Sequence, residues 1–297
     1  MKYRTLGRTG IRVSQIGLGA TQIGNLDVSP RRAEAVLKGA LDGGVNFFDT
    51  APRYFESEER IGRFLSHRKD EFTVATKCGP YRLRNEKGEY EAHRDYSRAG
   101  IHAAIERSRR RLRLERIGIV QFHGLPDDRS LWDEAYDALA EAKENGWVGA
   151  IGVSADGAVA VEAAKRYDWD THEFNYNILY QDAVSDLFPL LRENDRGGIA
   201  KRPIANAVFL GNTYDEGAEA NLLRERLRTF PLRDLAGSMP LIEFAIRFNL
   251  AQPLVHTMII GTADPEHMQQ NLAYGALDPL APEMVNKAKA AFSALPH

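Results

Sequence analysis

Cysteine is nearly absent from this sequence of 297 residues. Cys78 is the single cysteine, so no internal disulfide can form and no cluster of cysteines can hold a metal. No apolar run reaches the roughly 18 residues of a membrane-spanning helix. The opening MKYRTLGRTG lacks the apolar segment of a secretory signal. These absences predict a cytoplasmic protein without a membrane span or a metal site.

An excess of charge of one sign is also missing. The 39 Lys and Arg residues stand against 41 Asp and Glu residues, a net charge of -2, so no basic excess indicates a nucleic-acid partner. Apolar residues make up 43% of the chain, as in ordinary globular proteins. The length would suit about two typical domains, but one barrel can also fill it. No linker or internal repeat divides the chain, so we expect a single domain over residues 1–297.

Short apolar runs alternate with longer segments of helical spacing, as in parallel βαβ units. Eight such units at this length predict an α/β fold, a closed (β/α)8 (TIM) barrel. The predicted strands are residues 16–18, 45–48, 72–75, 117–120, 148–151, 173–174, 198–200 and 257–260. The predicted helices are residues 30–41, 97–112, 131–145, 156–167, 187–194, 240–250 and 264–274.

Three further segments do not follow this alternation. The first twelve residues predict a β-hairpin that turns at residues 8–10. Residues 79–96 and 211–238 are long and polar, and we expect them to be loops after the third and seventh strands. Long loops within a compact domain are usually functional. In a barrel they would lie on the C-terminal face, where active sites are found.

Polar side chains end three successive predicted strands. Asp49, Lys77 and His123 end the second, third and fourth strands, and Tyr54 follows five residues after Asp49. Each residue alone is more often structural, as a rim ion pair or a satisfied core histidine. Because neighbouring strand ends meet at one rim of a barrel, their joint placement favours a shared catalytic site.

The chemistry of these four side chains follows from their acidity. A free tyrosine titrates near about 10, which is too high for efficient proton transfer at neutral pH. A lysine cation beside Tyr54 should lower its pKa, and Asp49 should hold the Lys77 cation in place. His123 could hydrogen-bond a substrate oxygen. Such a tyrosine suits carbonyl reduction or alcohol oxidation, whereas no nucleophile–base pair of a hydrolase is evident.

The order of these motifs resembles the aldo-keto reductases over residues 2–275. The similar segments are GVNFFDTAPRY (44–54), TK (76–77), QFH (121–123), YRTLGRTG (3–10), IGLG (16–19) and IIGTADPEH (259–267) with Asn271. The resemblance implies a barrel that reduces aldehydes, ketones or sugars with a nicotinamide nucleotide. It also implies that Tyr54 is the general acid, that Lys77 and Asp49 tune it, and that His123 orients the carbonyl.

The same resemblance implies where the nucleotide binds. Residues 17–24 imitate a dinucleotide fingerprint, but Gln22 replaces its third glycine. In the resembled family, the nucleotide instead binds in an extended form across the barrel rim. The residues expected to bind it are Gly19, Thr21, Ser154, Glu173, Gly261, Thr262, Asp264, His267 and Asn271.

Several of these positions depart from the family pattern. The family favours NADPH, whose 2′-phosphate pairs with Lys or Arg. Gly261, Asp264 and His267 stand in that loop here and favour NADH, so both nucleotides stay open. Ala155 replaces a usual Asn at the nicotinamide end, and Glu173 is the nearest match to a usual Gln. Gly118 replaces an Asp before the histidine motif.

The sequence constrains the substrate less strongly, and it leaves alternative functions open. Arg53, Phe55 and Tyr81 are the expected substrate contacts and would suit a sugar or a carboxylated aldehyde, although a solvated charged loop is the simpler reading. One alternative is a non-catalytic nucleotide-binding or regulatory subunit on the same barrel. Another is an isomerase or aldolase that uses Lys77 as a Schiff base, but Asp49 would keep that lysine protonated. The oligomeric state is left open.

Overall fold

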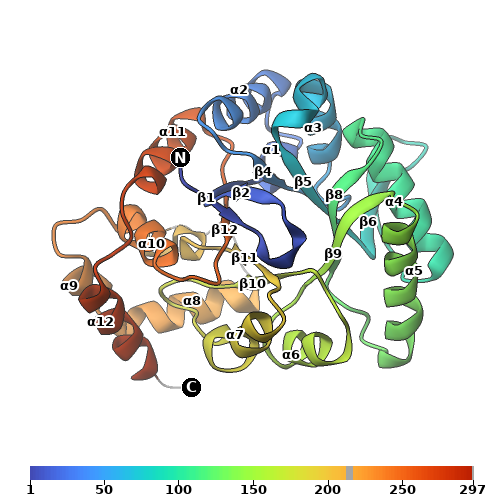
Figure 1. The fold of residues 1–297 in the computed structure, drawn as a ribbon. Helices are drawn as coiled ribbons and strands as arrows, with labels where there is room; N and C mark the ends of the chain where they lie inside the picture. The colour runs from blue at the N-terminus through green and yellow to red at the C-terminus, as the bar shows by residue number, and fades with distance from the viewer. Residues whose placement is uncertain (212–216, 296–297) are drawn as a thin grey trace.

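A computed structural model describes residues 1–211 and 217–295. Within them, parallel strands close into an eight-stranded barrel surrounded by helices, as predicted (Figure 1). Around the barrel, neighbours follow chain order from β3 to β12, and β12 pairs with β3. The barrel strands are β3 (Ile16–Gly19), β4 (Phe47–Asp49), β5 (Thr73–Cys78), β8 (Ile117–His123), β9 (Val148–Ser154), β10 (Thr171–Asn175), β11 (Gly197–Lys201) and β12 (Thr257–Gly261).

The helices pack outside the barrel, and their starts follow local sequence signals. In α2, the Ser29 side chain accepts a hydrogen bond from the backbone of Arg32, and Pro30 takes the first helical position. The larger helices are α2 (Pro30–Asp42), α3 (Ser57–Leu65), α4 (Arg98–Leu112), α5 (Trp132–Glu144), α6 (Gly157–Arg166), α7 (Ala183–Glu193), α8 (Ala218–Thr229), α10 (Leu241–Leu250), α11 (Pro265–Ala276) and α12 (Pro282–Ser293). The short helical segments are α1 (Thr21–Gly24), α9 (Leu232–Ala236) and the 3-10 turns Gly7–Thr9, Ser66–Glu71, Arg129–Leu131 and Ala205–Leu210.

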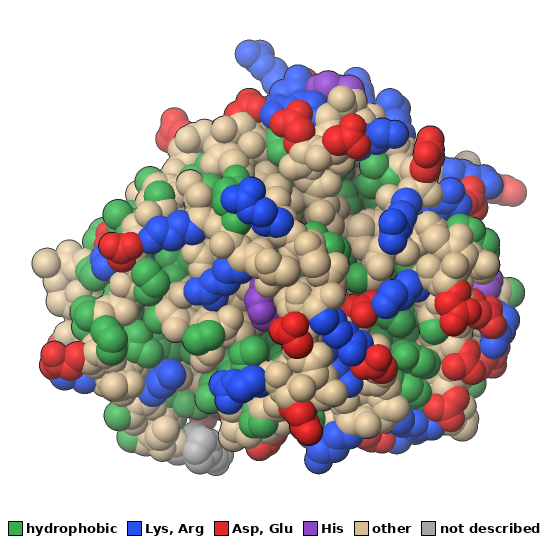
Figure 2. Space-filling model, in the orientation of Figure 1, with side chains coloured by type: hydrophobic (Ala, Val, Ile, Leu, Met, Phe, Trp, Pro, Cys, Tyr) green, Lys and Arg blue, Asp and Glu red, His purple; other side chains and the backbone are tan. Residues whose placement is uncertain are grey.

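The N-terminal hairpin closes one end of the barrel. Strands β1 (Tyr3–Thr5) and β2 (Arg12–Ser14) pair antiparallel, which confirms the predicted hairpin. Its Leu6 and Val13 are fully buried and pack against inward side chains of the barrel strands. Figure 1 shows the hairpin in front of the barrel, and Figure 2 shows acidic, basic and apolar side chains interspersed on this face. The partners of Leu6 and Val13 are Phe47, Ala75, Ile119, Ala150 and Ile199.

The two segments predicted as loops contain regular structure. Residues 79–96 form an antiparallel hairpin of β6 (Pro80–Arg84) and β7 (Tyr90–Arg94). The loop prediction for residues 211–238 is wrong where α8 and α9 lie, while its residues 212–216 are outside the described part. In α8, Ala220 and Leu223 are buried and Leu227 packs against the core, so one narrow apolar face docks a largely polar helix. Helices α3 and α12 were likewise not predicted.

Two negative findings apply to the described residues. No helix among them is long and apolar enough to cross a membrane. Among the same residues, no three His, Cys, Asp or Glu side chains are grouped so that they could hold a metal ion.

Candidate active site

The alternation of side chains along the strands brings Asp49 and Lys77 inside the barrel. Successive residues of a strand point to opposite faces, so residues two positions apart share a face. Asp49 therefore points inward like Phe47, and Lys77 points inward like Ala75. The register partner of Asp49 on β5 is Ala75, which is the inward residue just before Lys77. Both charged side chains are therefore directed to the C-terminal end of the barrel, opposite the N-terminal hairpin.

The Lys77 ammonium is fully buried and surrounded by oxygens. It donates to both carboxylate oxygens of Asp49, at 2.6 and 2.5 Å, and to the backbone carbonyl of Thr50 at 3.2 Å. The Glu173 carboxylate forms a second ion pair at 3.2 Å. Although burial disfavours the ammonium, Asp49 and Glu173 together raise the pKa of Lys77. Lys77 is therefore a fixed cation.

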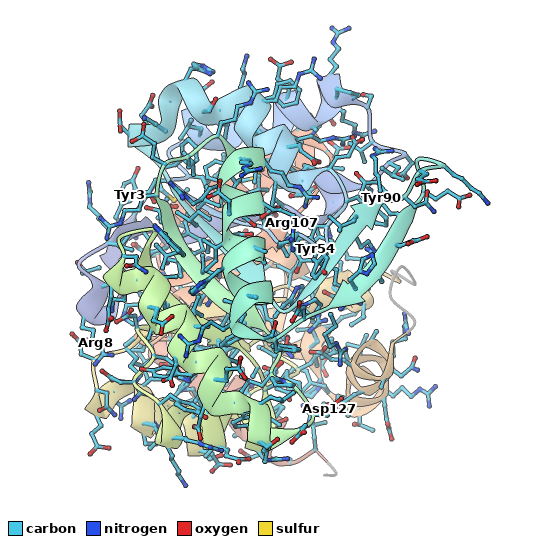
Figure 3. The ribbon with its side chains drawn as sticks, turned by 90° about the vertical axis from the view of Figure 1, so that its right-hand side faces the viewer. Tyr3, Arg8, Tyr54, Tyr90, Arg107 and Asp127 are labelled. Carbon is cyan, nitrogen blue, oxygen red and sulfur yellow. The ribbon has the colours of Figure 1, made fainter. Side chains whose placement is uncertain are left out.

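Tyr54 and His123 meet beside this cation. The Tyr54 hydroxyl lies 3.5 Å from Nε2 of His123, with the two rings edge to face at 87°. The Lys77 ammonium lies 5.7 Å from the centre of the Tyr54 ring. In Figure 3 Tyr54 lies toward the β6–β7 hairpin, whereas Tyr3 and Arg8 of the N-terminal hairpin lie at the other end. The four residues expected to be catalytic are thus brought together.

The acidity expected for Tyr54 needs a correction. Burial raises the pKa of Tyr54, and this effect outweighs the lowering by the Lys77 cation. The expectation that Lys77 would lower the tyrosine pKa overall is therefore wrong for this structure, although the direction of the lysine's own effect is right. Burial lowers the pKa of His123 to about 3, so the imidazole is neutral near pH 7. Tyr54 and His123 form a neutral pair able to hydrogen-bond one oxygen.

Three residues on neighbouring strands extend the site. Ser154 donates to Glu173 across 3.0 Å, and Lys201 lies 3.4 Å from the Ser154 hydroxyl. Lys201 also forms an ion pair with Asp156 at 2.8 Å. Sequence reasoning missed Lys201, although its position at the end of the predicted seventh strand is the same signal that identified Lys77.

The loop after the last barrel strand is organised around Asp264. Its carboxylate accepts from the backbone of Glu266 and starts α11, and the Thr262 hydroxyl accepts from the backbone of Asp264. Arg32 of α2 pairs with Asp264 at 2.8 Å and donates to the carbonyl of Ala263. The negative charge of Asp264, one of the residues expected to favour NADH, is therefore neutralised by an arginine that is distant in the sequence.

The other nucleotide positions lie around this loop. Gly19 pairs with Gly261 in the barrel, and a Cβ on Gly261 would lie 2.1 Å from the Gln22 amide oxygen. Asn271 is buried on α11, while His267 is exposed on the same helix. The exposed Thr21 side chain interacts with Tyr54, which connects this loop region to the tyrosine.

The expected substrate residues are not equally placed. Arg53 is exposed next to Tyr54, and Phe55 contacts Tyr90 of the β6–β7 hairpin at 5.3 Å between ring centres. The Tyr81 ring stacks on His93 and has the Arg107 guanidinium 4.4 Å from its centre. Tyr81 is therefore engaged in packing that hairpin against α4.

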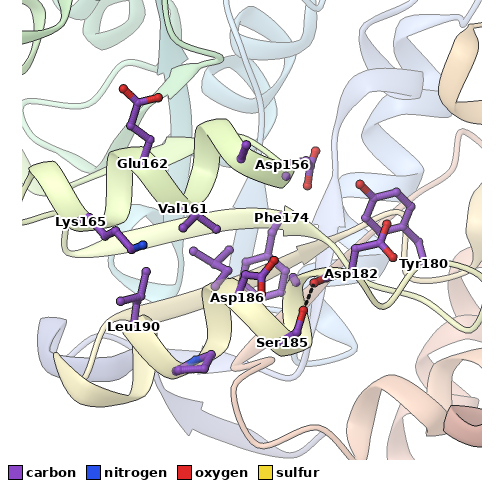
Figure 4. Close-up of a pocket in the computed structure, with 15 residues that line it drawn as sticks. Asp156, Val161, Glu162, Lys165, Phe174, Tyr180, Asp182, Ser185, Asp186 and Leu190 are labelled. Carbon is purple, nitrogen blue, oxygen red and sulfur yellow. Dashed lines mark hydrogen bonds between the residues drawn. The ribbon is translucent and has the colours of Figure 1, made fainter. Parts of the chain in front are cut away.

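One groove lies away from these residues. A groove of about 820 Å³ opens between α6 and α7 on the outside of the barrel (Figure 4). Val161, Phe174 and Leu190 form part of its apolar lining, and Glu162 and Asp186 are among its charged residues. Asp49, Tyr54, Lys77 and His123 do not line it, so this groove is separate from the candidate site.

Fold and site together define a (β/α)8-barrel protein with a buried Asp–Lys pair beside Tyr and His at its C-terminal mouth. The chain belongs to the Aldo/keto reductase family, whose sequence profile matches residues 15–292. This membership confirms the resemblance seen in the motifs. The chain is an oxidoreductase acting on carbonyl or alcohol groups, and the family generally uses NAD(P)H.

Individual relatives cover nearly the whole chain. D-threo-aldose 1-dehydrogenase from Pseudomonas sp is 31% identical over 91% of this chain and 91% of that protein. A probable voltage-gated potassium channel subunit beta from Oryza sativa subsp. japonica is 30% identical over 100% and 98%. The holo form of aldo-keto reductase AKR11C1 from Bacillus halodurans matches with a TM-score of 0.82 and 28% identity, over 98% and 96%.

Proposed function

We propose that this chain interconverts a carbonyl compound and its alcohol with an NAD(P) nucleotide, using Tyr54 as the proton donor and acceptor. The observation that carries this proposal is the meeting of Tyr54 and His123 at 3.5 Å beside the buried Lys77–Asp49 pair. In reduction, the carbonyl carbon gains a hydride and its oxygen gains the Tyr54 proton. In oxidation both transfers reverse.

The side chains around the nicotinamide position have free hydrogen-bonding capacity that fits such a nucleotide. Among the described residues, His123 Nδ1 and Gln22 Oε1 are buried without a hydrogen-bond partner. Buried polar atoms nearly always have a hydrogen-bond partner, so we expect these atoms to bind a ligand or water. Glu173 Oε2, which Lys77 contacts at 3.2 Å, would also accept from the carboxamide N–H, with Ser154 beside it. The bound nicotinamide supplies or accepts the hydride.

Each protein group then has a separate task. His123 is neutral and can orient the substrate oxygen toward Tyr54 through Nε2. The Lys77 cation stabilises the tyrosinate that forms when Tyr54 gives up its proton. Asp49 holds Lys77 protonated, which also argues against the alternative in which Lys77 forms a Schiff base. Gly19, Thr21, Gly261, Thr262, Asp264, His267 and Asn271 would hold the rest of the nucleotide.

For the substrate, the aldose named in the Pseudomonas relative supports a sugar or another polar carbonyl compound. Arg53 and Phe55 flank Tyr54 and remain our proposed contacts. Tyr81 contributes through the β6–β7 hairpin that it packs. NADPH and NADH are both compatible with the Arg32–Asp264 pair, since it offers a cation and an anion together.

The direct test is a Tyr54→Phe variant. Loss of the proton donor should lower kcat by about 10²- to 10⁴-fold toward an aldose or aldehyde. Fluorescence titration with NADPH and NADH should give unchanged affinities, because the phenyl ring keeps its packing. Turnover within a few-fold of the parent would contradict the role of Tyr54. Nucleotide binding without any turnover by the parent protein, across a panel of sugars and aldehydes, would instead support the regulatory alternative.

A further inference from the structure

The site contains one more carboxylate than its lysines neutralise. Lys77 contacts both Asp49 and Glu173, at 2.5 and 3.2 Å, and all three side chains are at most 3% exposed. Lys201 is the next cation, and it is already paired with Asp156 at 2.8 Å. Three carboxylates therefore face two ammonium groups across the mouth of the barrel.

The other polar groups facing this cluster do not supply the missing positive charge. His123 is half-buried and neutral, and Tyr54 is protonated. Arg53 is exposed, so water screens it from the buried carboxylates. Although burial opposes its charge, Lys77 and Lys201 hold the pKa of Glu173 down to about 2. Burial and Glu173 raise the pKa of Asp49, which is the response expected of a site that attracts positive charge.

Oxidised and reduced nicotinamide differ in charge. The oxidised ring is a cation and the reduced ring is neutral, so a surplus buried carboxylate stabilises the first more than the second. The effect is strong in a buried site, because the effective dielectric constant there is well below that of water.

We propose that Glu173 makes this enzyme bind the oxidised nicotinamide nucleotide in preference to the reduced one, and so makes the bound reduced nucleotide a stronger hydride donor. The inference rests on the proposed function, because it requires the nicotinamide to lie beside Lys77 and Glu173. Glu173 acts here as a residue that selects the redox state of the nucleotide by its charge, apart from any hydrogen bond to the carboxamide.

The experiment compares two dissociation constants on each protein at pH 8. The reduced nucleotide is titrated by fluorescence and the oxidised one by competition, using NADP or NAD, whichever binds the parent protein more tightly. Because both constants come from one preparation, their ratio does not depend on the folded fraction. Glu173→Gln keeps the side-chain size and removes the charge. Glu173→Asp keeps the charge, and Glu162→Gln removes a carboxylate from the outer face of α6.

Glu173→Gln should shift the ratio toward the reduced nucleotide by about tenfold or more. Glu173→Asp should keep most of the parental preference, and Glu162→Gln should keep all of it. Equal weakening of both nucleotides in Glu173→Gln, or an unchanged ratio, would overturn the inference and leave the proposed function standing. Failure of the parent protein to bind either nucleotide would overturn the proposed function itself, and this inference with it.

Discussion

The Lys77 ammonium contacts both oxygens of the Asp49 carboxylate, at 2.6 and 2.5 Å, in the closed interior of the barrel. Neither side chain reaches solvent to any extent, so each charge depends on the other for its solvation. The pair is therefore both a proposed catalytic element and a condition for stability. These two roles can be separated by experiment.

Lys77→Met should destabilise the protein strongly. The substitution leaves Asp49 and Glu173 buried without their cation, and breaking a buried ion pair in this way costs about 3 to 5 kcal/mol. Urea unfolding at pH 7 measures the loss. Lys287→Met is the matched control, since Lys287 pairs with Glu283 on the surface of α12. Exposed pairs of this kind contribute about 0.3 to 0.5 kcal/mol, so equal losses in the two variants would argue against a buried pair.

Buried histidines should make the protein less stable in mild acid. Burial lowers the pKa of His172 to about 3, below the ordinary value of 6.5. As pH falls through 6.5 the unfolded chain gains a proton that the folded chain does not, so stability decreases until about pH 3. This one residue should cost about 2 kcal/mol between pH 7 and pH 5.

His172→Gln should flatten that pH dependence by the same amount, as measured by urea unfolding at the two pH values. His67→Gln removes an exposed histidine and serves as the control. The comparison uses the difference between two pH values, so a general loss of stability in His172→Gln does not affect it. An unchanged pH dependence would mean that His172 takes up its proton in the folded state.

Asp264→Asn should move nucleotide preference toward NADPH. Asn caps a helix about as well as Asp, so α11 should keep its start. The change removes a negative charge from the loop and releases Arg32 from its ion pair. We expect the affinity for NADPH relative to NADH to rise by roughly threefold to tenfold, as for one partly exposed charge. Glu266→Gln changes an exposed carboxylate in the same turn. An equal effect of both variants would show that nucleotide preference depends on the overall charge of this turn rather than on Asp264 itself.

Much of the fold was predictable because local rules control it. The apolar runs gave all eight barrel strands, since strands covered on both faces must be apolar along their length. Ser29–Pro30 marked the start of α2 through capping that involves only neighbouring residues. Helices α3, α8 and α12 were missed because their apolar faces are short or irregular. Their positions are decided by packing against other helices and the barrel rim.

The relative strength of the electrostatic effects on the tyrosine pKa could be judged only from the structure. Sequence reasoning placed Lys77 near Tyr54 and correctly gave the sign of the lysine's effect on the tyrosine pKa. It could not weigh that effect against burial, because burial depends on how completely the surrounding elements close over Tyr54.

The sequence by itself determined that Asp49, Lys77 and His123 share one rim, because each ends a parallel strand and side chains alternate along strands. Only the tertiary structure brought Glu173 to Lys77, Lys201 to Ser154, and Arg32 to Asp264. These partners come from distant parts of the chain. Their contacts are fixed by the closure and register of the barrel, which the sequence pattern of any one segment does not contain.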